Sequence, residues 1–299
     1  MKTLLLTQPM PAAAFLAAIA ARAPEIEVVE YRSSMSDDEL ASFDAALGWQ
    51  MPPSLAARLP RVGWICAIAA GVEKLLPPEL APHVRVSRIV DPEQAAGIAQ
   101  YVVAMALRHA RSLERYDQQQ LARDWTRQPM PMARHAVAVL GTGAMGGEIA
   151  RWLERVGLVV RGWNRSSGAG LDEVLAASRI VVCALPLTAA TEGILDARAF
   201  AQMPRGGYLI NIARGSHVVE SDLIAAVRSG HLSGAALDVQ RREPLPADDP
   251  LWDVPSITIT PHIAAQSSTE TIAEQFVTAW RALGRGEPPP NEVDRSRGY

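Results

Sequence analysis

Three side chains suited to acid–base chemistry follow three strand-like runs in the last third of the sequence: Arg214, Glu243 and His262. A guanidinium group can bind and polarise the oxygens of a carboxylate or a carbonyl group. An imidazole can donate a proton near neutral pH, and a carboxylate at its far nitrogen orients the ring and favours its protonated form. Each residue type is common on protein surfaces, so the interpretation depends on the surrounding sequence.

A glycine-rich segment upstream of these residues predicts a site for phosphate groups. The apolar run 136–140 is typical of a buried parallel strand, and the pattern G-x-G-x-x-G follows it at 141–146. The first glycine permits a tight turn, the second lets the backbone approach a pyrophosphate, and the third lets a helix pack closely on the strand. The N-terminus of that helix offers unpaired N–H groups to phosphates. The residues expected to contact a dinucleotide here are Gly141, Gly143, Ala144, Met145 and Gly146.

The end of the next predicted strand favours NADP over NAD. This strand ends at Trp163, and Asn164 lies 23 residues after Gly141. An acidic residue at this position would bond the ribose hydroxyls of NAD and repel a 2′-phosphate. Asn164 is uncharged, and its neighbours Arg165 and Ser166 offer a planar set of donors and a hydroxyl to a phosphate. A polar surface turn without a role in cofactor choice is the alternative.

Hydride transfer to a 2-keto acid is the chemistry that these features suit together. A doubly wound sheet exposes the loops that follow its strands, and the three segments lie in such positions. Arg214 would hold the keto-acid oxygens and polarise the carbonyl group, His262 would donate a proton as hydride arrives, and Glu243 would orient the imidazole. The other histidines have no such neighbours and are interpreted as structural. His217 lies nearest to Arg214, and the rest are His83, His109, His135 and His231.

The elements that must position these residues alternate between strand and helix in two parts of the chain. Residues 2–90 predict a small α/β layer domain. Pro92 then starts a long helix, with Asp91 as its N-cap, and one broad apolar face continues to about Leu121. From residue 136 the alternation predicts a doubly wound parallel sheet of the Rossmann type. Strands are expected at 3–6, 27–31, 45–49 and 63–68, and then at 136–140, 158–163, 179–184, 208–212, 234–238 and 256–259.

The composition is that of an ordinary globular protein with two domains. The chain has 299 residues, 48% of them hydrophobic and 20% charged, which is enough to bury a sizeable core. The net charge of -3 argues against a nucleic-acid-binding surface. No spacing of ligands predicts a metal site. Cys66 and Cys183 lie in apolar runs, as the reduced core thiols of a cytoplasmic protein do.

The apolar N-terminus admits two interpretations. Lys2, Leu4–Leu6 and the small residues of 12–21 have the composition of a secretion signal. Pro9 and Pro11 divide that stretch, which suits a strand, a turn and a helix better. No apolar run reaches the roughly 18 residues of a membrane span.

Taken together, the motifs resemble the D-isomer-specific 2-hydroxyacid dehydrogenase family, and within it the glyoxylate/hydroxypyruvate reductase A branch. The resemblance covers most of the chain. Gln240 departs from the pattern, because relatives often carry phenylalanine there. The segments that carry the resemblance are Leu140–Gly146, Trp163–Ser166, Leu185–Thr188, Asn211–Gly215, Leu237–Pro246, Thr260–Ala264 and Val293–Tyr299.

The resemblance implies an activity and an architecture. The protein would be an NADPH-dependent reductase of small 2-keto acids, with NAD as a possible second cofactor. It would have a cofactor domain of residues 92–269 and a smaller, flavodoxin-like substrate domain of residues 1–91, completed by about 270–299. A homodimer built on the cofactor domain is also implied, with no nucleic-acid or membrane partner.

The resemblance also implies roles for individual residues. Arg214, Glu243 and His262 would be catalytic. The backbone around Ala70 and Gly71 would bind the substrate carboxylate, since small residues let an oxyanion approach the amides. Trp49 would form a wall of the pocket. Further cofactor contacts are implied at Leu185, Pro186, Ile212, Ala213 and Asp238.

Two other functions remain open on the sequence alone. The glycine pattern and Trp163–Ser166 also resemble β-hydroxyacid dehydrogenases and imine reductases, which use NADPH. Those enzymes carry the pattern at the N-terminus and depend on a later lysine, whereas Lys2 and Lys74 are the only lysines here and both lie upstream. The second alternative is a dinucleotide-sensing interaction protein without turnover, because a fold alone does not decide function.

Overall fold

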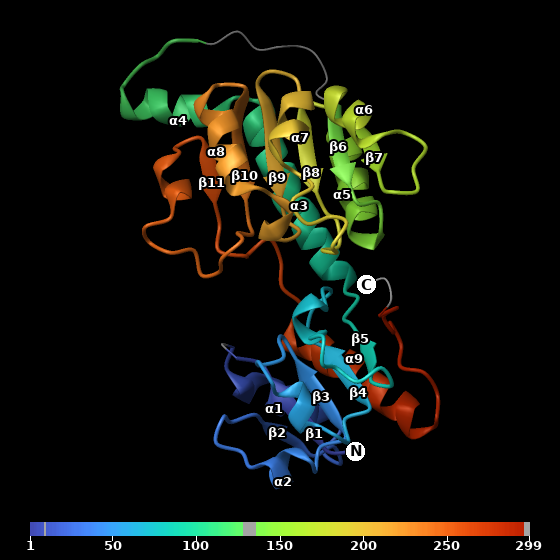
Figure 1. Ribbon diagram of the computed structural model, residues 1–299. Helices are drawn as coiled ribbons and strands as arrows, with labels where there is room; N and C mark the ends of the chain where they lie inside the picture. The colour runs from blue at the N-terminus through green and yellow to red at the C-terminus, as the bar shows by residue number, and fades with distance from the viewer. Residues whose placement is uncertain (9, 128–135, 296–299) are drawn as a thin grey trace. The chain divides into compact units, whose positions relative to one another are not determined.

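Two compact units make up the chain in the computed structural model, drawn in Figure 1. Unit 1 comprises Met1–Pro92 and Gln266–Tyr299, and unit 2 comprises Glu93–Ala265. The structure describes residues 1–8, 10–127 and 136–295. The expectations for Pro9, for His135 and for the last four residues of the chain therefore lie outside the described residues.

Unit 1 is built on a five-stranded parallel sheet with the order β2-β1-β3-β4-β5. This is the strand order of flavodoxin-like folds. The sequence predicts four of these strands. It does not reveal β5, because Arg85 and Ser87 leave only one apolar residue in that strand, too few for a recognisable apolar run. The strands are β1 (Thr3–Leu6), β2 (Val28–Glu30), β3 (Ala45–Gly48), β4 (Trp64–Ala67) and β5 (Arg85–Ser87).

The last helix of the chain returns to unit 1 and packs beside the first. Helices α1 (Ala12–Arg22) and α9 (Thr269–Gly284) share one face of the sheet, and their apolar side chains belong to one buried cluster. Phe276 of α9 stacks on Trp64 of β4 with ring centroids 5.3 Å apart. The short helix α2 (Asp37–Leu40) contributes to the cluster on the other face. Unit 1 is therefore assembled from both ends of the chain.

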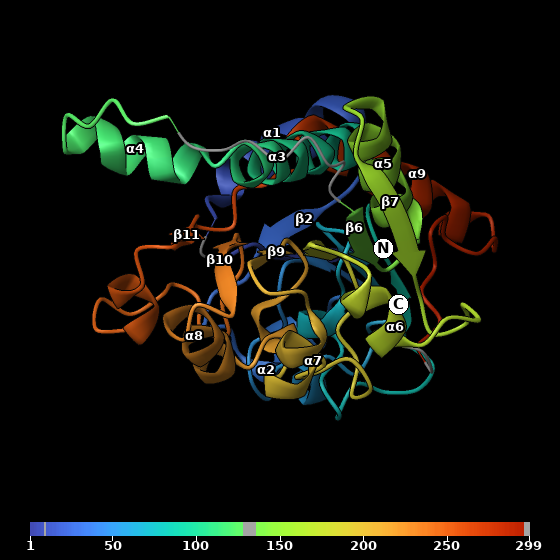
Figure 2. The ribbon, with the colours of Figure 1, turned by 90° about the horizontal axis from the view of Figure 1, so that it is seen from above.

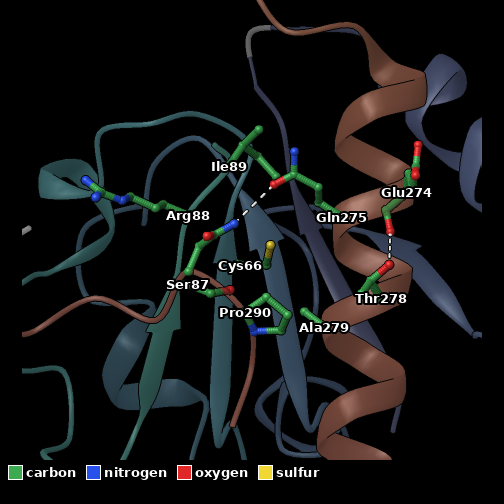
Figure 3. A pocket seen from close by; sticks show the side chains of 10 residues that line it. Cys66, Ser87, Arg88, Ile89, Glu274, Gln275, Thr278, Ala279 and Pro290 are labelled. Carbon is green, nitrogen blue, oxygen red and sulfur yellow. Dashed lines mark hydrogen bonds between the residues drawn. The ribbon is translucent and has the colours of Figure 1, made fainter. Parts of the chain in front are cut away.

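The segment after α9 is fastened to the same sheet. Between β4, β5 and α9 lies a small cavity of about 90 Å³, whose lining includes Cys66 and Gln275 (Figure 3). Gln275 accepts hydrogen bonds from the backbone N–H of Val90 at 3.1 Å and from Asn291 Nδ2 at 3.3 Å. Burial raises the pKa of the Cys66 thiol to about 12. The guanidinium of Arg295 donates to four main-chain carbonyls, those of Leu80, Ala81, Pro82 and Val84.

Unit 2 is built on a six-stranded parallel sheet with the order β11-β10-β9-β8-β6-β7. Its first strand, β6, lies between β7 and β8, so the strand order reverses at this point. Ligands of such sheets bind at the carboxyl ends of the strands beside the reversal. The strands are β6 (Ala136–Leu140), β7 (Val159–Trp163), β8 (Ile180–Cys183), β9 (Gly207–Asn211), β10 (Leu232–Leu237) and β11 (Ile257–Ile259).

Helices cover both faces of the unit 2 sheet, as Figure 2 shows from above. Helices α3 and α5 bury their apolar residues on one face, and α6, α7 and α8 bury theirs on the other. The predicted fold class, an α/β protein with a Rossmann sheet and a smaller α/β unit, is confirmed. The helices are α3 (Pro92–Ala110), α5 (Ala144–Arg155), α6 (Leu171–Ala176), α7 (Ala197–Gln202) and α8 (Glu220–Arg228).

The prediction of one long helix from Pro92 to about Leu121 is wrong. Helix α3 ends at Ala110, and a separate helix, α4 (Leu113–Leu121), follows it (Figure 1). Ser112 between them has φ of 54°, a left-handed conformation that cannot continue a right-handed helix. The apolar residues of the two helices follow the spacing expected for one continuous helix, so the sequence pattern does not indicate the break. Within the described ranges, no helix combines the length and the apolarity needed to cross a membrane.

Candidate active site

The glycine-rich loop joins β6 to α5 beside the point where the strand order reverses. Gly141 has φ of 100°, and a Cβ there would lie 2.4 Å from the carbonyl oxygen of Ala184. A Cβ at Gly146 would lie 1.7 Å from the carbonyl oxygen of Gly141. A Cβ at Gly143 would meet no heavy atom within 4 Å. The protein itself thus requires glycine at the first and third positions, whereas at the second it leaves room for a ligand.

The N-terminus of α5 faces the same loop with its amides. Gly143 is the N-cap and provides no side-chain hydrogen bond to the helix. The N–H groups of Ala144, Met145 and Gly146 belong to the first turn, and such groups have no partner inside a helix. The helix dipole adds partial positive charge at this end. The loop and helix therefore fit the pyrophosphate of a dinucleotide.

The turn after β7 is tied to the glycine-rich loop. Asn164 Nδ2 donates to Thr142 Oγ1 at 2.5 Å, and Asn164 Oδ1 accepts from the backbone N–H of Ser166 at 2.8 Å. The side chain of Asn164 is therefore engaged within the protein. Arg165 and Ser166 are both exposed. This arrangement leaves the guanidinium of Arg165 at the surface, where it can pair with a 2′-phosphate.

Two of the predicted catalytic side chains are in direct contact. His262 Nδ1 lies 3.1 Å from Glu243 Oε2. The other oxygen, Glu243 Oε1, accepts a hydrogen bond from the backbone N–H of Gln240 at 3.1 Å. The buried side chain of Gln240 donates to the carbonyl of Leu237 at 3.0 Å. The carboxylate is thereby held on two sides, and it can orient the imidazole by accepting its Nδ1 proton.

Asp238, at the end of β10, organises the turn that carries the histidine. Its carboxylate accepts hydrogen bonds from Thr260 Oγ1 at 2.6 Å and from the backbone N–H groups of Ile263 and Ala264, both at 2.9 Å. The hydroxyl of Tyr101 on α3 lies 2.8 Å from Thr260 Oγ1. Burial raises the pKa of Tyr101, which keeps its hydroxyl neutral and able to share a proton in this network.

Arg214 lies in a tight turn after β9 that packs on the loop carrying Glu243. Asn211 Nδ2 donates to the Arg214 carbonyl at 2.9 Å, and Arg214 Nη1 donates to the Ala213 carbonyl at 2.7 Å. A Cβ at Gly215 would lie only 1.9 Å from the carbonyl carbon of Gln240. The two loops therefore touch through their main chains, and only glycine permits this approach.

The remaining predicted residues divide between the two units. Four of them belong to unit 2: Leu185 and Pro186 lie in the loop after β8, and the buried Ile212 and Ala213 follow β9. Ala70 and Gly71 follow β4 in unit 1. Among the residues that the structure describes, no group accepts a hydrogen bond from the N–H of either one. Trp49 follows β3, and Lys74 Nζ lies 4.9 Å from the centroid of its ring.

Some residues of this network were not singled out by the sequence. Tyr101 and Thr260 are 159 residues apart, and no local pattern connects them. His217 was interpreted as structural, yet its ring lies against the Arg214 main chain, with Nδ1 3.2 Å from the backbone nitrogen of Arg214. Its place three residues after Arg214 is the only signal in the sequence. Over residues 1–8, 10–127 and 136–295, no cluster of three or more His, Cys, Asp or Glu side chains could hold a metal.

Comparisons with known proteins agree over nearly the whole chain. The profile of the D-isomer specific 2-hydroxyacid dehydrogenase NAD binding domain matches residues 103–264. Glyoxylate/hydroxypyruvate reductase A of Yersinia enterocolitica is 34% identical over 305 aligned positions, which cover 95% of this chain and 96% of that protein.

Two solved structures extend the likeness to three dimensions. A D-isomer specific 2-hydroxyacid dehydrogenase from Xanthobacter autotrophicus Py2, in complex with NADPH and MES, has a TM-score of 0.90 and 35% identity, and the match covers 100% of this chain and 99% of that one. The NADPH-dependent glyoxylate/hydroxypyruvate reductase of Sinorhizobium meliloti, in complex with NADP and sulfate, has a TM-score of 0.91 and 30% identity, with coverage of 100% and 99%. The chain therefore belongs to the D-isomer specific 2-hydroxyacid dehydrogenase family.

Proposed function

We propose that this protein is an NADPH-dependent reductase that converts small 2-keto acids, of the glyoxylate and hydroxypyruvate class, to 2-hydroxy acids. The observation that carries the proposal is the contact of 3.1 Å between His262 Nδ1 and Glu243 Oε2, on a unit whose glycine-rich loop fits a dinucleotide. The names of the relatives from Yersinia and Sinorhizobium support the substrate class. The bound NADPH and NADP of solved relatives support the cofactor.

His262 would be the proton donor of this reaction. When bound, the reduced nicotinamide supplies a hydride to the carbonyl carbon of the substrate. The imidazolium of His262 donates its Nε2 proton to the carbonyl oxygen, and the ring becomes neutral. Glu243 accepts the Nδ1 proton as a hydrogen bond and so keeps the ring in one orientation during the transfer. One hydride at carbon and one proton at oxygen together give the 2-hydroxy acid.

Arg214 would hold the substrate on unit 2. The guanidinium of Arg214 offers paired donors to the oxygens of the keto acid and stabilises the charge that develops on the carbonyl oxygen. Unit 1, taken by itself, offers the N–H groups of Ala70 and Gly71 as donors to a carboxylate, because small side chains let an oxyanion approach the amides.

The test is a panel of 2-keto acids assayed with NADPH and with NADH. We expect oxidation of NADPH with glyoxylate or hydroxypyruvate, and slower oxidation of NADH. Acetaldehyde serves as the control substrate, because it has the carbonyl group but no carboxylate for Arg214 to bind. Tight binding of NADPH without turnover of any keto acid in the panel would instead indicate a dinucleotide-sensing protein.

A homodimer built on unit 2 is part of the proposal. Helix α4 and the segment after it expose large apolar side chains, with Leu121 79% and Trp125 99% accessible. Exposed apolar residues that recur along one element are typical of a surface that a partner covers. We expect the substitution of both residues by glutamate to convert a dimer into a monomer in light scattering. A monomeric wild-type protein would contradict this assembly.

A cytoplasmic location is also proposed. Cys66 and Cys183 are both buried, and neither forms a disulfide. Proteins of oxidising compartments usually pair their cysteines, whereas free thiols are usual in the reducing cytoplasm. Fractionation of cells that express the untagged protein, followed by immunodetection, would show it with the cytoplasmic fraction if this is correct.

A further inference from the structure

His217 joins two loops of unit 2 through both nitrogens of its ring. Its side chain is fully buried. Nδ1 lies 3.2 Å from the backbone nitrogen of Arg214 and 3.0 Å from the Arg214 carbonyl oxygen. Nε2 lies 3.3 Å from the carbonyl oxygen of Pro186. One rigid ring thus connects the turn that carries Arg214 with the loop that follows β8.

The contacts of the ring fit one neutral tautomer. A carbonyl oxygen can only accept, so Nε2 must carry a proton to bond Pro186. Nδ1 is then the acceptor, and the backbone N–H of Arg214 donates to it at 3.2 Å. The Arg214 carbonyl, 3.0 Å from the same nitrogen, accepts instead from Asn211 Nδ2 and from the backbone N–H of His217. A proton on Nδ1 would serve that carbonyl alone and would leave the ring without a hydrogen bond to Pro186 or to the Arg214 N–H. Both partners of the ring are main-chain groups, so replacing the side chains of Arg214 or Pro186 would not remove these hydrogen bonds.

Further hydrogen bonds restrict the conformation of the segments around His217. The backbone N–H of Leu195 donates to the His217 carbonyl at 3.0 Å. Thr191 Oγ1 also donates to the Pro186 carbonyl, at 2.7 Å. Asn211 Nδ2 holds the Arg214 carbonyl at 2.9 Å. The main chain of Arg214 is therefore held from one side by Asn211 and from the other by His217.

We propose that His217 is a positioning residue for substrate binding. It fixes the main chain of Arg214 relative to the Pro186 carbonyl, so that the guanidinium extends from a defined place toward the keto acid. The inference rests on the proposed function, in which Arg214 binds that substrate. A displacement of about 1 Å at a group that orients a substrate can lower activity about 100-fold. A histidine with no role beyond packing would not act selectively on the keto acid.

Two amide substitutions separate the two hydrogen bonds of the ring. An asparagine places its polar atoms near the position of Nδ1, and a glutamine places its polar atoms near that of Nε2. His217→Asn therefore retains an acceptor for the Arg214 N–H, whereas His217→Gln retains only a donor to Pro186. We expect His217→Gln to raise the KM for the keto acid about tenfold or more, and His217→Asn to raise it much less. The Kd for NADPH should change less than about twofold in both.

Hydrogen exchange supplies a readout that does not depend on turnover. The amide of Arg214 loses its acceptor in His217→Gln but keeps one in His217→Asn. We therefore expect faster exchange of the Arg214 amide in the glutamine variant alone, measured by mass spectrometry on peptides that span residues 211–217. An inactive wild-type protein would reject the proposed function, while the exchange experiment would still decide the role of His217.

His231→Asn is the matched control. His231 lies just before the start of β10, and its Nε2 also bonds a backbone carbonyl, that of Phe200, at 2.9 Å. This variant should leave both the KM and the exchange of Arg214 unchanged. Equal effects of the two His217 variants, or no effect of either, would overturn the proposal. If neither variant folds, Asn211→Ser removes the amide that donates to the Arg214 carbonyl at 2.9 Å. An unchanged keto-acid KM in that variant would also reject the idea that this main chain must be held.

Discussion

The backbone N–H of His262 donates to the main-chain carbonyl of Asp238 at 2.9 Å, while His262 itself has φ of 55°. This left-handed conformation is uncommon for a residue with a side chain, and it persists only where the surroundings determine it. Asp238 does so twice, because its carboxylate also holds the N–H groups of Ile263 and Ala264. The main-chain conformation from which the imidazole extends is therefore fixed by an aspartate at the end of the neighbouring strand, whereas Glu243 contacts the ring itself.

Asp238→Ala should destabilise the protein as well as reduce its activity. The substitution leaves the N–H groups of Ile263 and Ala264 and the hydroxyl of Thr260 without their acceptor. A loss of about 1–3 kcal/mol in the free energy of unfolding is expected for unsatisfied groups of this kind. Urea denaturation followed by circular dichroism measures it. Asp238→Asn keeps one acceptor oxygen and should lose less; equal stability of the alanine variant and wild type would contradict this role.

His262→Ala should lower kcat by about 10²- to 10⁴-fold, the usual contribution of a general acid. The folded structure should survive, because the side chain of His262 is only partly buried. Steady-state kinetics with NADPH and glyoxylate, together with a thermal unfolding curve, separate the two effects. Turnover within a few-fold of wild type would remove His262 from the role of proton donor.

Glu243→Gln should lower kcat for keto-acid reduction about 10- to 100-fold. The carboxylate can accept the Nδ1 proton of His262 and so hold the ring in one orientation. An amide can turn its N–H donor toward Nδ1 instead, and the orientation is then no longer fixed. Steady-state kinetics with NADPH and glyoxylate measures the change. Equal kcat values for the variant and wild type would show that the carboxylate does not orient the ring.

Alanine at two glycines of the same loop should have opposite consequences. At Gly143 the new Cβ meets no protein atom, so stability should stay within about 0.5 kcal/mol of wild type, but the Kd for NADPH should rise about tenfold. At Gly146 the Cβ would lie 1.7 Å from a main-chain oxygen, and a loss of about 1–3 kcal/mol in stability is expected. Thermal unfolding and NADPH fluorescence titration distinguish the two. A stable Gly143→Ala variant with unchanged NADPH affinity would separate this loop from the cofactor.

The double variant Asn164→Asp with Arg165→Ala should shift the cofactor preference toward NADH. The new carboxylate can bond ribose hydroxyls and repels a 2′-phosphate, and the loss of Arg165 removes the charge that pairs with it. The ratio of kcat/KM for NADPH to that for NADH should fall about 10- to 100-fold, as expected for a charge-assisted hydrogen bond. The single variant Arg165→Lys, which keeps the charge, is the control. An unchanged ratio in the double variant would assign the preference to other residues.

Most of the fold follows from local patterns in the sequence. The buried parallel strands are nearly continuous apolar runs, so all ten expected strands agree with the structure to within about two residues at each end. The largest difference is at β10, which begins two residues before the expected run 234–238. The helix break at Ser112 and the strand β5 were not predicted, because one depends on the conformation of a single residue and the other on pairing with a distant strand.

The sequence by itself determined the dinucleotide loop, the family and the residue types suited to catalysis, because each depends on contiguous segments whose spacing has a direct physical reason. Only the tertiary structure decided which groups form hydrogen bonds to the loops that carry the catalytic residues. The bonds from Asp238 to the His262 turn, from Tyr101 to Thr260 and from His217 to Pro186 join different loops and elements of unit 2. Such partners come together only when the sheet places the carboxyl ends of its strands side by side, and no spacing along the chain records that arrangement.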